Sequence, residues 1–177
     1  MATDLKVKGL SELNSFLGSL PTKMAANIMR GALRAGAKPI KEAAVANAPT
    51  GEPSEAGKIR YKLYNGALRD SIRISGRIDR RNGNIKARII AGGKSKKTGA
   101  NVYYAHMVEY GTKRHSTKKG GRGDQNHPGT IARPFLRPAL DDKASEAIKT
   151  AGEYVKKRLA TKHGINTVDI NIELDEE

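Results

Sequence analysis

The stretch that decides the fold class runs from residue 68 to residue 91 and reads LRDSIRISGRIDRRNGNIKARIIA. Apolar residues recur at alternate positions on both sides of a central turn signal, as is typical of half-buried strands. These positions are Leu68, Ile72 and Ile74 before the turn and Ile85, Ala87, Ile89 and Ala91 after it. Asp70 shares the parity of Leu68 and Ile72, whereas Ser71 falls on the other side of the predicted strand. Asn82 and Gly83 suit the two positive-φ positions of a type I′ turn. The stretch therefore predicts a β-hairpin from about Leu68 to Ala91.

Two helices are expected before this hairpin. Leucines at helical spacing within residues 10–17 predict a short helix from about Ser11 to Leu20, which Pro21 ends. The following segment, from Thr22 to Ala48, is rich in alanine and predicts a longer helix. We expect this helix to kink near Pro39 and to end before Pro49.

Three segments around and after the hairpin are expected to lack long regular elements. Residues 50–66 (TGEPSEAGKIRYKLYNG) predict a loop with at most one turn, and residues 92–100 predict a polar loop. Residues 101–111 (NVYYAHMVEYG) fit a helix or a strand, and we interpret them as a short helix or turn flanked by extended chain. Residues 113–130 (KRHSTKKGGRGDQNHPGT) have almost no apolar side chain and predict a mobile loop that acts in binding.

A long helix is expected near the C-terminus, with Pro138 in its first turn and Gly164 as its stop. Asp141 and Asp142 lie near its positive end, and cations at 156–158 lie near its negative end. Its apolar stripe comprises Leu140, Ala144, Ile148, Ala151, Val155 and Leu159. Beyond it, residues 168–174 alternate and predict a final strand or an arm that adds to a sheet edge.

These elements predict an α+β fold. We expect one domain over residues 1–164, with long loops at 50–66 and 113–133. Residues 165–177 form a C-terminal strand or acidic arm, with five acids between Asp169 and Glu177.

Composition restricts the function classes. The chain has 177 residues, with 33 Lys and Arg against 18 Asp and Glu, and a net charge of +15. Such a charge attracts polyanions: nucleic acid, an anionic membrane or an acidic protein surface. The absence of cysteine excludes disulfides, thiolate metal sites and thiol catalysis. No apolar run is long enough to span a membrane, and the first residues lack a signal-peptide pattern.

The search for catalytic chemistry centres on Glu109, the only carboxylate between Asp79 and Asp124. It could act as a general base, but no acid–base partner accompanies it. We favour a structural anchor that pairs with Arg133 or Arg137, or accepts backbone N–H groups near Thr112. The histidines (His106, His115, His127 and His163) lack metal-ligand spacing. We expect no enzyme activity, no metal site and no cofactor.

Basic and aromatic residues leave a nucleic-acid interaction open. Arginines of the hairpin and cations of residues 113–130 could contact phosphates, although no helix-turn-helix, RRM, KH or zinc-finger pattern is present. Tyr103, Tyr104 and Tyr110 could stack on bases. Packing at a core edge or a subunit contact is the favoured interpretation of these tyrosines.

Three motifs in a fixed order carry a resemblance to a known family. They are APTG (48–51) with GALRDSI (66–72), YYAHMVEYGT (103–112) and ARPFLRPAL (132–140), and they follow the alanine-rich helix. The set resembles the tail-completion or head–tail joining (neck) proteins of tailed phages, a kind that includes the Z-type minor tail protein of lambdoid siphophages. The resemblance covers residues 10–159. The chain departs from the family pattern by an insertion at residues 52–65 and by a long loop between Thr112 and Pro134.

The resemblance implies an α+β subunit of a homo-oligomeric ring, expected to be a hexamer, in the virion neck. Its implied partners are copies of itself, the head connector or stopper, and tail terminator or tail tube proteins. Genomic DNA in the neck channel is a further partner, and assembly would occur in the host cytoplasm. The alternative is a sequence-nonspecific nucleic-acid-binding protein.

Site residues follow from the motifs and from the basic loop. Motif residues expected to act as structural anchors are Gly66, Leu68, Ser71, Ile72, Tyr104, Glu109, Gly111, Thr112, Pro134, Phe135 and Pro138. Candidate contacts to a partner or to DNA are Lys113, Arg114, Lys118, Lys119 and Arg122. We expect Gly66 and Gly111 to allow unusual backbone turns, and Leu68 and Ile72 to face the core from one side of a strand. Phe135 is expected to be a buried anchor between two prolines.

Overall fold

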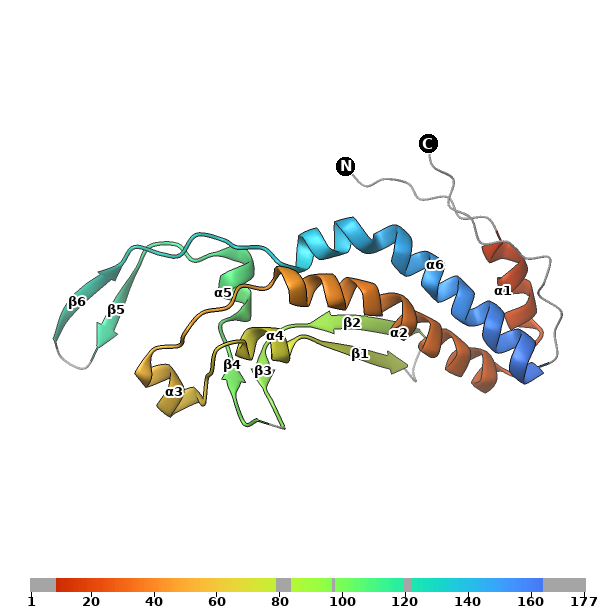
Figure 1. The fold of residues 1–177 in the computed structure, drawn as a ribbon, viewed down its shortest axis with the longest axis horizontal. Helices are drawn as coiled ribbons and strands as arrows, with labels where there is room; N and C mark the ends of the chain where they lie inside the picture. Colours follow the sequence, from red (N-terminus) through yellow and green to blue (C-terminus); the bar gives the residue numbers. More distant parts are fainter. Residues whose placement is uncertain (1–8, 79–83, 97, 120–121, 164–177) are drawn as a thin grey trace. The chain divides into compact units, whose positions relative to one another are not determined.

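A computed structural model of the chain describes residues 9–78, 84–96, 98–119 and 122–163 (Figure 1). The chain forms two compact units, each built from separate segments. Unit 1 takes residues 1–43, 74–89 and 140–177, and unit 2 takes residues 44–73 and 90–139. The elements are α1 (Leu10–Gly18), α2 (Thr22–Asn47), α3 (Glu55–Tyr61), α4 (Ala67–Ser71), β1 (Arg73–Ile78), β2 (Ile85–Ile90), β3 (Gly93–Lys94), β4 (Asn101–Val102), α5 (Ala105–Tyr110), β5 (His115–Lys119), β6 (Arg122–His127) and α6 (Leu136–His163). The predicted α+β class is confirmed.

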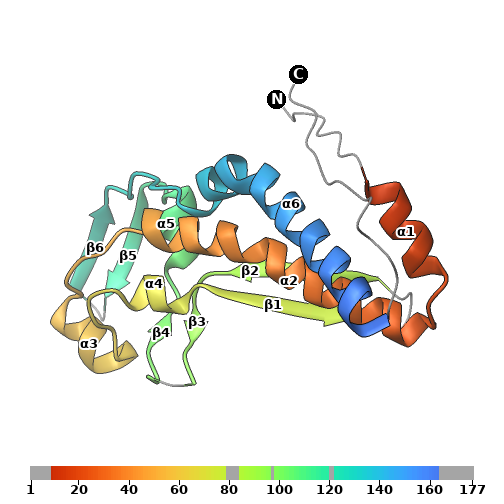
Figure 2. The same cartoon turned by 45° about the vertical axis from the view of Figure 1, so that its right-hand side comes forward.

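Three helices form the core of unit 1. Its buried side chains come from α1, α2 and α6, and they are Leu13, Leu17, Ile28, Ala32, Val155 and Leu159. Helix α2 continues as helix through Pro39. Small residues let α2 and α6 approach closely, since a Cβ at Gly36 would lie 2.5 Å from the carbonyl oxygen of Ala147. Figures 1 and 2 both draw these two helices side by side.

A two-stranded hairpin of β1 and β2 completes unit 1. Half-buried and exposed residues alternate along both strands, as the sequence predicted. A Cβ at Gly76 would lie within 3.3–3.6 Å of the side chains of Arg34 and Arg30, so the aliphatic stems of these arginines pack on β1. The expected Asn82–Gly83 turn lies outside the described residues.

The sequence predicted a hairpin that begins at about Leu68, but in the structure the hairpin begins later. Residues 67–71 form helix α4, and the strand begins at Arg73. Leu68 and Ile72 are both buried (3% exposed each), but Leu68 belongs to α4 and Ile72 is the extended residue that follows it, so they are not two positions of one strand. The strand interpretation placed Asp70 on the buried side and Ser71 on the exposed side; in the structure Asp70 is exposed and Ser71 is buried.

The two long loops contain more structure than the sequence predicted. Helix α3 lies within residues 50–66, and the Ser54 hydroxyl caps it by accepting from the Gly57 N–H at 3.2 Å. The mobile loop predicted over residues 113–130 is instead an antiparallel pair of β5 and β6, in which His115 lies opposite His127. Backbone hydrogen bonds hold such a pair without any apolar face, so alternation of apolar residues could not reveal it.

The remaining elements follow the expectations more closely. Residues 101–110 give a short strand, β4, paired with β3, followed by the short helix α5, which confirms the favoured interpretation. Helix α6 begins at Leu136, two residues before Pro138, and Leu140 of the predicted stripe is 52% exposed. Gly164 and the strand predicted over residues 168–174 lie outside the described residues.

We expect Gly36→Ala to destabilise the protein by about 1–3 kcal/mol, the usual cost of overpacking a tight contact. The new methyl group would lie 2.5 Å from the Ala147 oxygen and 3.1 Å from the Ala151 Cβ, which forces α2 and α6 apart. A lower urea midpoint at unchanged m-value would show the effect. Gly18→Ala is the control, because nothing lies within 4 Å of a Cβ there; an equal loss in both variants would contradict the packing argument.

Candidate functional site

Glu109 of α5 caps the first turn of α6 with its side chain. One carboxylate oxygen, Oε2, accepts from the N–H groups of Phe135 and Leu136 at 2.8 and 2.9 Å. The other, Oε1, accepts from the N–H of Arg137 at 3.1 Å. Glu109 is 6% exposed, so these bonds form away from solvent. A residue 26 positions earlier in the chain thus binds the start of the long helix.

The first N–H groups of any helix lack partners within the helix, and they carry its positive partial charge. Helix α6 has no acidic residue in its own first turn, so the negative charge comes from Glu109. The structural-anchor interpretation predicted N–H donors near Thr112 or ion pairs with Arg133 or Arg137; the donors are instead at residues 135–137, and Arg137 contributes its backbone. Because both oxygens accept hydrogen bonds, the geometry favours an anchor over a general base.

The two motifs around Glu109 and Phe135 lie side by side. Thr112 and Thr130 form an isolated antiparallel bridge with N–H to oxygen distances of 2.9 and 3.0 Å, and the Arg133 N–H donates to the Val108 carbonyl at 2.8 Å. Gly111 has φ 70°, and a Cβ there would lie 2.6 Å from the Thr130 carbonyl oxygen. Only glycine fits this turn and this close approach. Phe135 is completely buried just beyond them.

The motif of residues 66–72 ties α4 to its neighbours through Ser71. The buried Ser71 hydroxyl donates to the Leu68 carbonyl at 2.6 Å and accepts from the Gly92 N–H at 2.8 Å. Arg73 donates to the Gly92 carbonyl at 2.7 Å, and Arg69 donates to the Ala48 carbonyl at 2.8 Å. Gly66, at φ 89°, precedes α4. These bonds join the end of α2, α4 and the segment after β2 within unit 2.

Tyr104 lines a pocket of unit 2, with a volume of about 430 Å³, that the sequence did not reveal. Three of its tyrosine rings contact one another: those of Tyr61 and Tyr103 are tilted with centroids 4.5 Å apart, and those of Tyr103 and Tyr104 meet edge to face at 5.8 Å. The pocket walls come from three stretches, residues 49–68 (Pro49, Thr50, Gly51, Glu52, Pro53, Ser54, Ala56, Gly57, Arg60, Tyr61, Leu63, Tyr64, Leu68), Tyr103–Tyr104 and Val108. The insertion at residues 52–65 therefore forms a wall of the pocket. Its two tyrosines, Tyr61 and Tyr64, were the sequence feature that could have indicated such a pocket.

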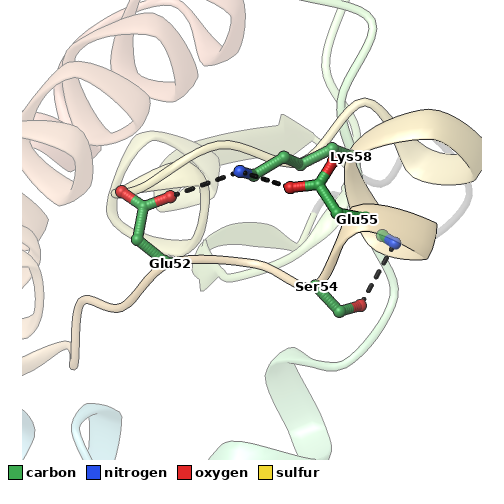
Figure 3. A network of polar contacts seen from close by, with 5 residues as sticks. Glu52, Ser54, Glu55 and Lys58 are labelled. Atoms are coloured by element: carbon green, nitrogen blue, oxygen red, sulfur yellow. Dashed lines mark hydrogen bonds and ion pairs between the residues drawn. The ribbon is translucent and has the colours of Figure 1, made fainter.

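Polar side chains surround this pocket. Lys58 lies 2.9 Å from Glu55 and 3.8 Å from Glu52. Figure 3 marks both ion pairs. The Tyr64 hydroxyl donates to Asp70 at 2.8 Å, and this bond raises the pKa of the Tyr64 phenol above its usual value. Partial burial raises the pKa of Tyr104. Both phenols are therefore uncharged at neutral pH, and the charged side chains of the pocket wall are Glu52 and Arg60.

The candidate contact residues lie on and beside the β5–β6 hairpin. Lys113 and Arg114 are exposed just before β5, Lys118 and Lys119 belong to β5, and Arg122 begins β6. The hairpin therefore gathers these five cations into one segment. Pro134 is exposed, and Pro138 is the third residue of α6.

Neither a metal cluster nor a membrane-spanning helix occurs in the part of the chain that the structure describes. Among these residues, no group of three His, Cys, Asp or Glu side chains could hold a metal ion. None of the helices the structure describes combines the length and hydropathy needed to cross a membrane.

Comparison with known proteins finds a family match. The family model described as "Bacteriophage HK97-gp10, putative tail-component" matches residues 11–111, more than half of the chain. No curated protein and no solved structure matches the chain significantly. The matched residues include α1 to α5 and end beside Glu109, whereas the β5–β6 hairpin and α6 lie beyond the match.

We expect Glu109→Ala to destabilise the protein by about 2–4 kcal/mol, because it leaves three N–H groups at a buried helix start without an acceptor. Glu109→Gln keeps one carbonyl oxygen and should cost less. Chemical denaturation measures both. Glu146→Ala is the control, since its bond to Lys143 is exposed and should be worth about 0–1 kcal/mol. A Glu109→Ala midpoint equal to that of Glu146→Ala would contradict the capping role.

We expect Phe135→Ala to cost about 3–5 kcal/mol, the usual range for removing a buried aromatic ring. Phe135 is 0% exposed, so its removal leaves a cavity beneath the start of α6. Thermal and urea denaturation measure the loss. Leu140→Ala, at a 52% exposed position, should have a much smaller effect; similar midpoints for the two variants would refute the assignment of Phe135 as an anchor.

Proposed function

Because the chain belongs to the HK97-gp10-like family of bacteriophage tail components, we propose that it is a ring-forming subunit of the virion neck. In this role it would join copies of itself into a closed ring between the head connector and the tail tube. Its work would be assembly: one surface binds the neighbouring copy, and the faces of the ring bind the adjoining particle proteins. Heterologous contacts of this kind close into rings when the rotation between subunits allows it.

The observation that supports this proposal is that the motif side chains bind backbone groups or lie buried. Glu109 binds three backbone N–H groups, the Ser71 hydroxyl binds two backbone groups, and Phe135 is buried. These side chains therefore hold backbone in place. Exposed cations and single apolar residues, such as Lys113, Arg114 and Ile131, are left free of this role and suit binding to a surface.

The β5–β6 hairpin supports a role in contact with partners. A lone two-stranded hairpin is marginally stable in water, and its outer strand edges carry unpaired backbone groups. Lys113, Arg114 and the cations of β5 and β6 give this segment a positive charge. We infer that an acidic partner surface, or DNA in the neck channel, binds along it.

We expect docking of the chain to acidic partner surfaces to weaken as salt rises from about 50 to 500 mM, because salt screens the attraction between such a surface and a chain of net charge +15. Light scattering after size-exclusion chromatography follows the complexes and the oligomer. Electron microscopy of intact particles tests the location. A protein that stays monomeric at every concentration and is absent from assembled virions would refute the neck role.

A second candidate, a sequence-nonspecific nucleic-acid-binding protein, rests on the same cations. A filter-binding titration of the isolated chain with duplex DNA separates the two functions. Tight binding with a steep salt dependence, together with no self-association, would favour the second candidate.

A further inference from the structure

The sheet of unit 1 has an outer edge that can accept one more strand. Strand β1 pairs with β2 along one edge, and within the described residues no strand pairs with its other edge. Unpaired N–H and C=O groups along such an edge bind an extended segment by adding it as a strand. The outer edge of β1 is therefore a binding surface, and its side chains indicate what it would bind.

Alternation gives β1 an apolar side and a polar side. The half-buried positions are Ile74, Gly76 and Ile78. The exposed positions include Ser75 and Arg77, and Lys86 and Arg88 are exposed in the same way on β2. A strand that joins this edge should therefore alternate as well, with apolar residues on one side and acidic or polar residues on the other.

The chain contains a segment with this pattern near its C-terminus. Residues 168–174 read VDINIEL, and their apolar residues alternate with Asp169, Asn171 and Glu173. Five acids lie between Asp169 and Glu177 in a chain whose net charge is +15. The segment thus supplies the negative charge that the exposed side of the hairpin lacks.

One antiparallel register matches residue types at each of five successive positions. The facing pairs are then Ile78–Val168, Arg77–Asp169, Gly76–Ile170, Ser75–Asn171 and Ile74–Ile172. The apolar residues of the segment fall on the half-buried side, and an opposite-charge pair and a polar pair fall on the exposed side. A shift by one residue would place Asp169 on the apolar side, so the alternation itself selects the register.

The edge lies within reach of the end of α6 in the same copy. Gly31 of α2 lies against Tyr154 of α6, and Gly76 of β1 lies against Arg34 of α2. The returning chain must retrace the nine residues of α6 after Tyr154, about 14 Å, and cross α2, which is about 10 Å wide. The seven residues from the end of α6 to Ile170 span about 23 Å when extended, which is enough.

The direction of the returning chain agrees with antiparallel pairing. Figures 1 and 2 both draw the end of α6 and the arrowhead of β1 toward the part of unit 1 where α2 begins. A segment that leaves α6 there and turns back along the sheet runs against the direction of β1. Residues 164–167 would form the connection, a length common between adjacent elements.

We propose that residues 168–174 add to the outer edge of β1 as an antiparallel strand within the same copy of the chain. The hairpin then becomes a three-stranded sheet, which is more stable than a lone pair of strands. The added strand also closes an edge that could otherwise pair with other chains before assembly. This inference goes beyond the proposed ring function and does not depend on it.

A disulfide tests the pairing directly, because the chain has no cysteine. Ser75→Cys with Asn171→Cys places two thiols on facing residues, at a Cα distance that a disulfide spans. Oxidised glutathione should close this disulfide within one copy in most of the chains. Ser75→Cys with Glu177→Cys is the matched control, because a segment free in solution would bring either position to residue 75 equally often. Equal yields in the two variants, or a disulfide that joins two copies, would overturn the proposal.

Hydrogen exchange of the full chain tests which side of the segment faces inward. Ile170→Asp should raise the exchange rate of the β1 amides about tenfold or more, because a charge on the half-buried side releases the added strand. Asn171→Asp introduces the same side chain on the exposed side and should leave the rate low. Circular dichroism checks that both variants fold. An unchanged rate in Ile170→Asp, or an equal rise in both variants, would refute the pairing.

Exchanging charges tests the register. Arg77→Glu and Asp169→Arg should each raise the exchange rate of the β1 amides about two- to fivefold, the usual effect of one cross-strand pair. The double variant should recover most of the protection, which no folding defect would produce. Losses that simply add in the double variant would show that Arg77 does not face Asp169, and the register would be wrong.

Discussion

The capping of α6 by Glu109 is the interaction on which the rest of unit 2 depends. A helix start in a protein interior must satisfy its free N–H groups, and here one carboxylate satisfies three of them. Because the carboxylate comes from α5, it also closes the 26-residue separation between the two elements. The described residues between 110 and 134 therefore form a segment whose two ends are held together by this capping. The β5–β6 hairpin extends from these joined ends.

This constraint separates the interior of the unit from its exposed surfaces. The most distinctive motif side chains face inward: Glu109 and Ser71 bind backbone groups, and Phe135 and Leu68 are buried. Exposed groups stand beside them, among them Tyr110, Ile131 and Arg133.

Local patterns in the sequence predicted those elements whose side chains alternate or repeat at a regular spacing. Helices α1, α2 and α6 and the alternation in β1 and β2 followed from such patterns. Two interpretations were wrong for physical reasons. Leu68 and Ile72 are four residues apart, a spacing that suits both a strand face and a helix face. The β5–β6 segment has no apolar face, so its backbone pairing left no trace in the sequence.

The sequence by itself determined the α+β class, the cationic charge and the place of Glu109 as the only carboxylate between Asp79 and Asp124. Those properties depend on residue types and on neighbours along the chain, so no tertiary contact was needed to read them. Only the tertiary structure decided which N–H groups Glu109 binds, that residues 49–68 form a wall of an aromatic pocket, and that Tyr110 and Ile131 lie exposed on paired segments. These features join residues far apart in the chain, and their pairing is decided by packing rather than by local preference.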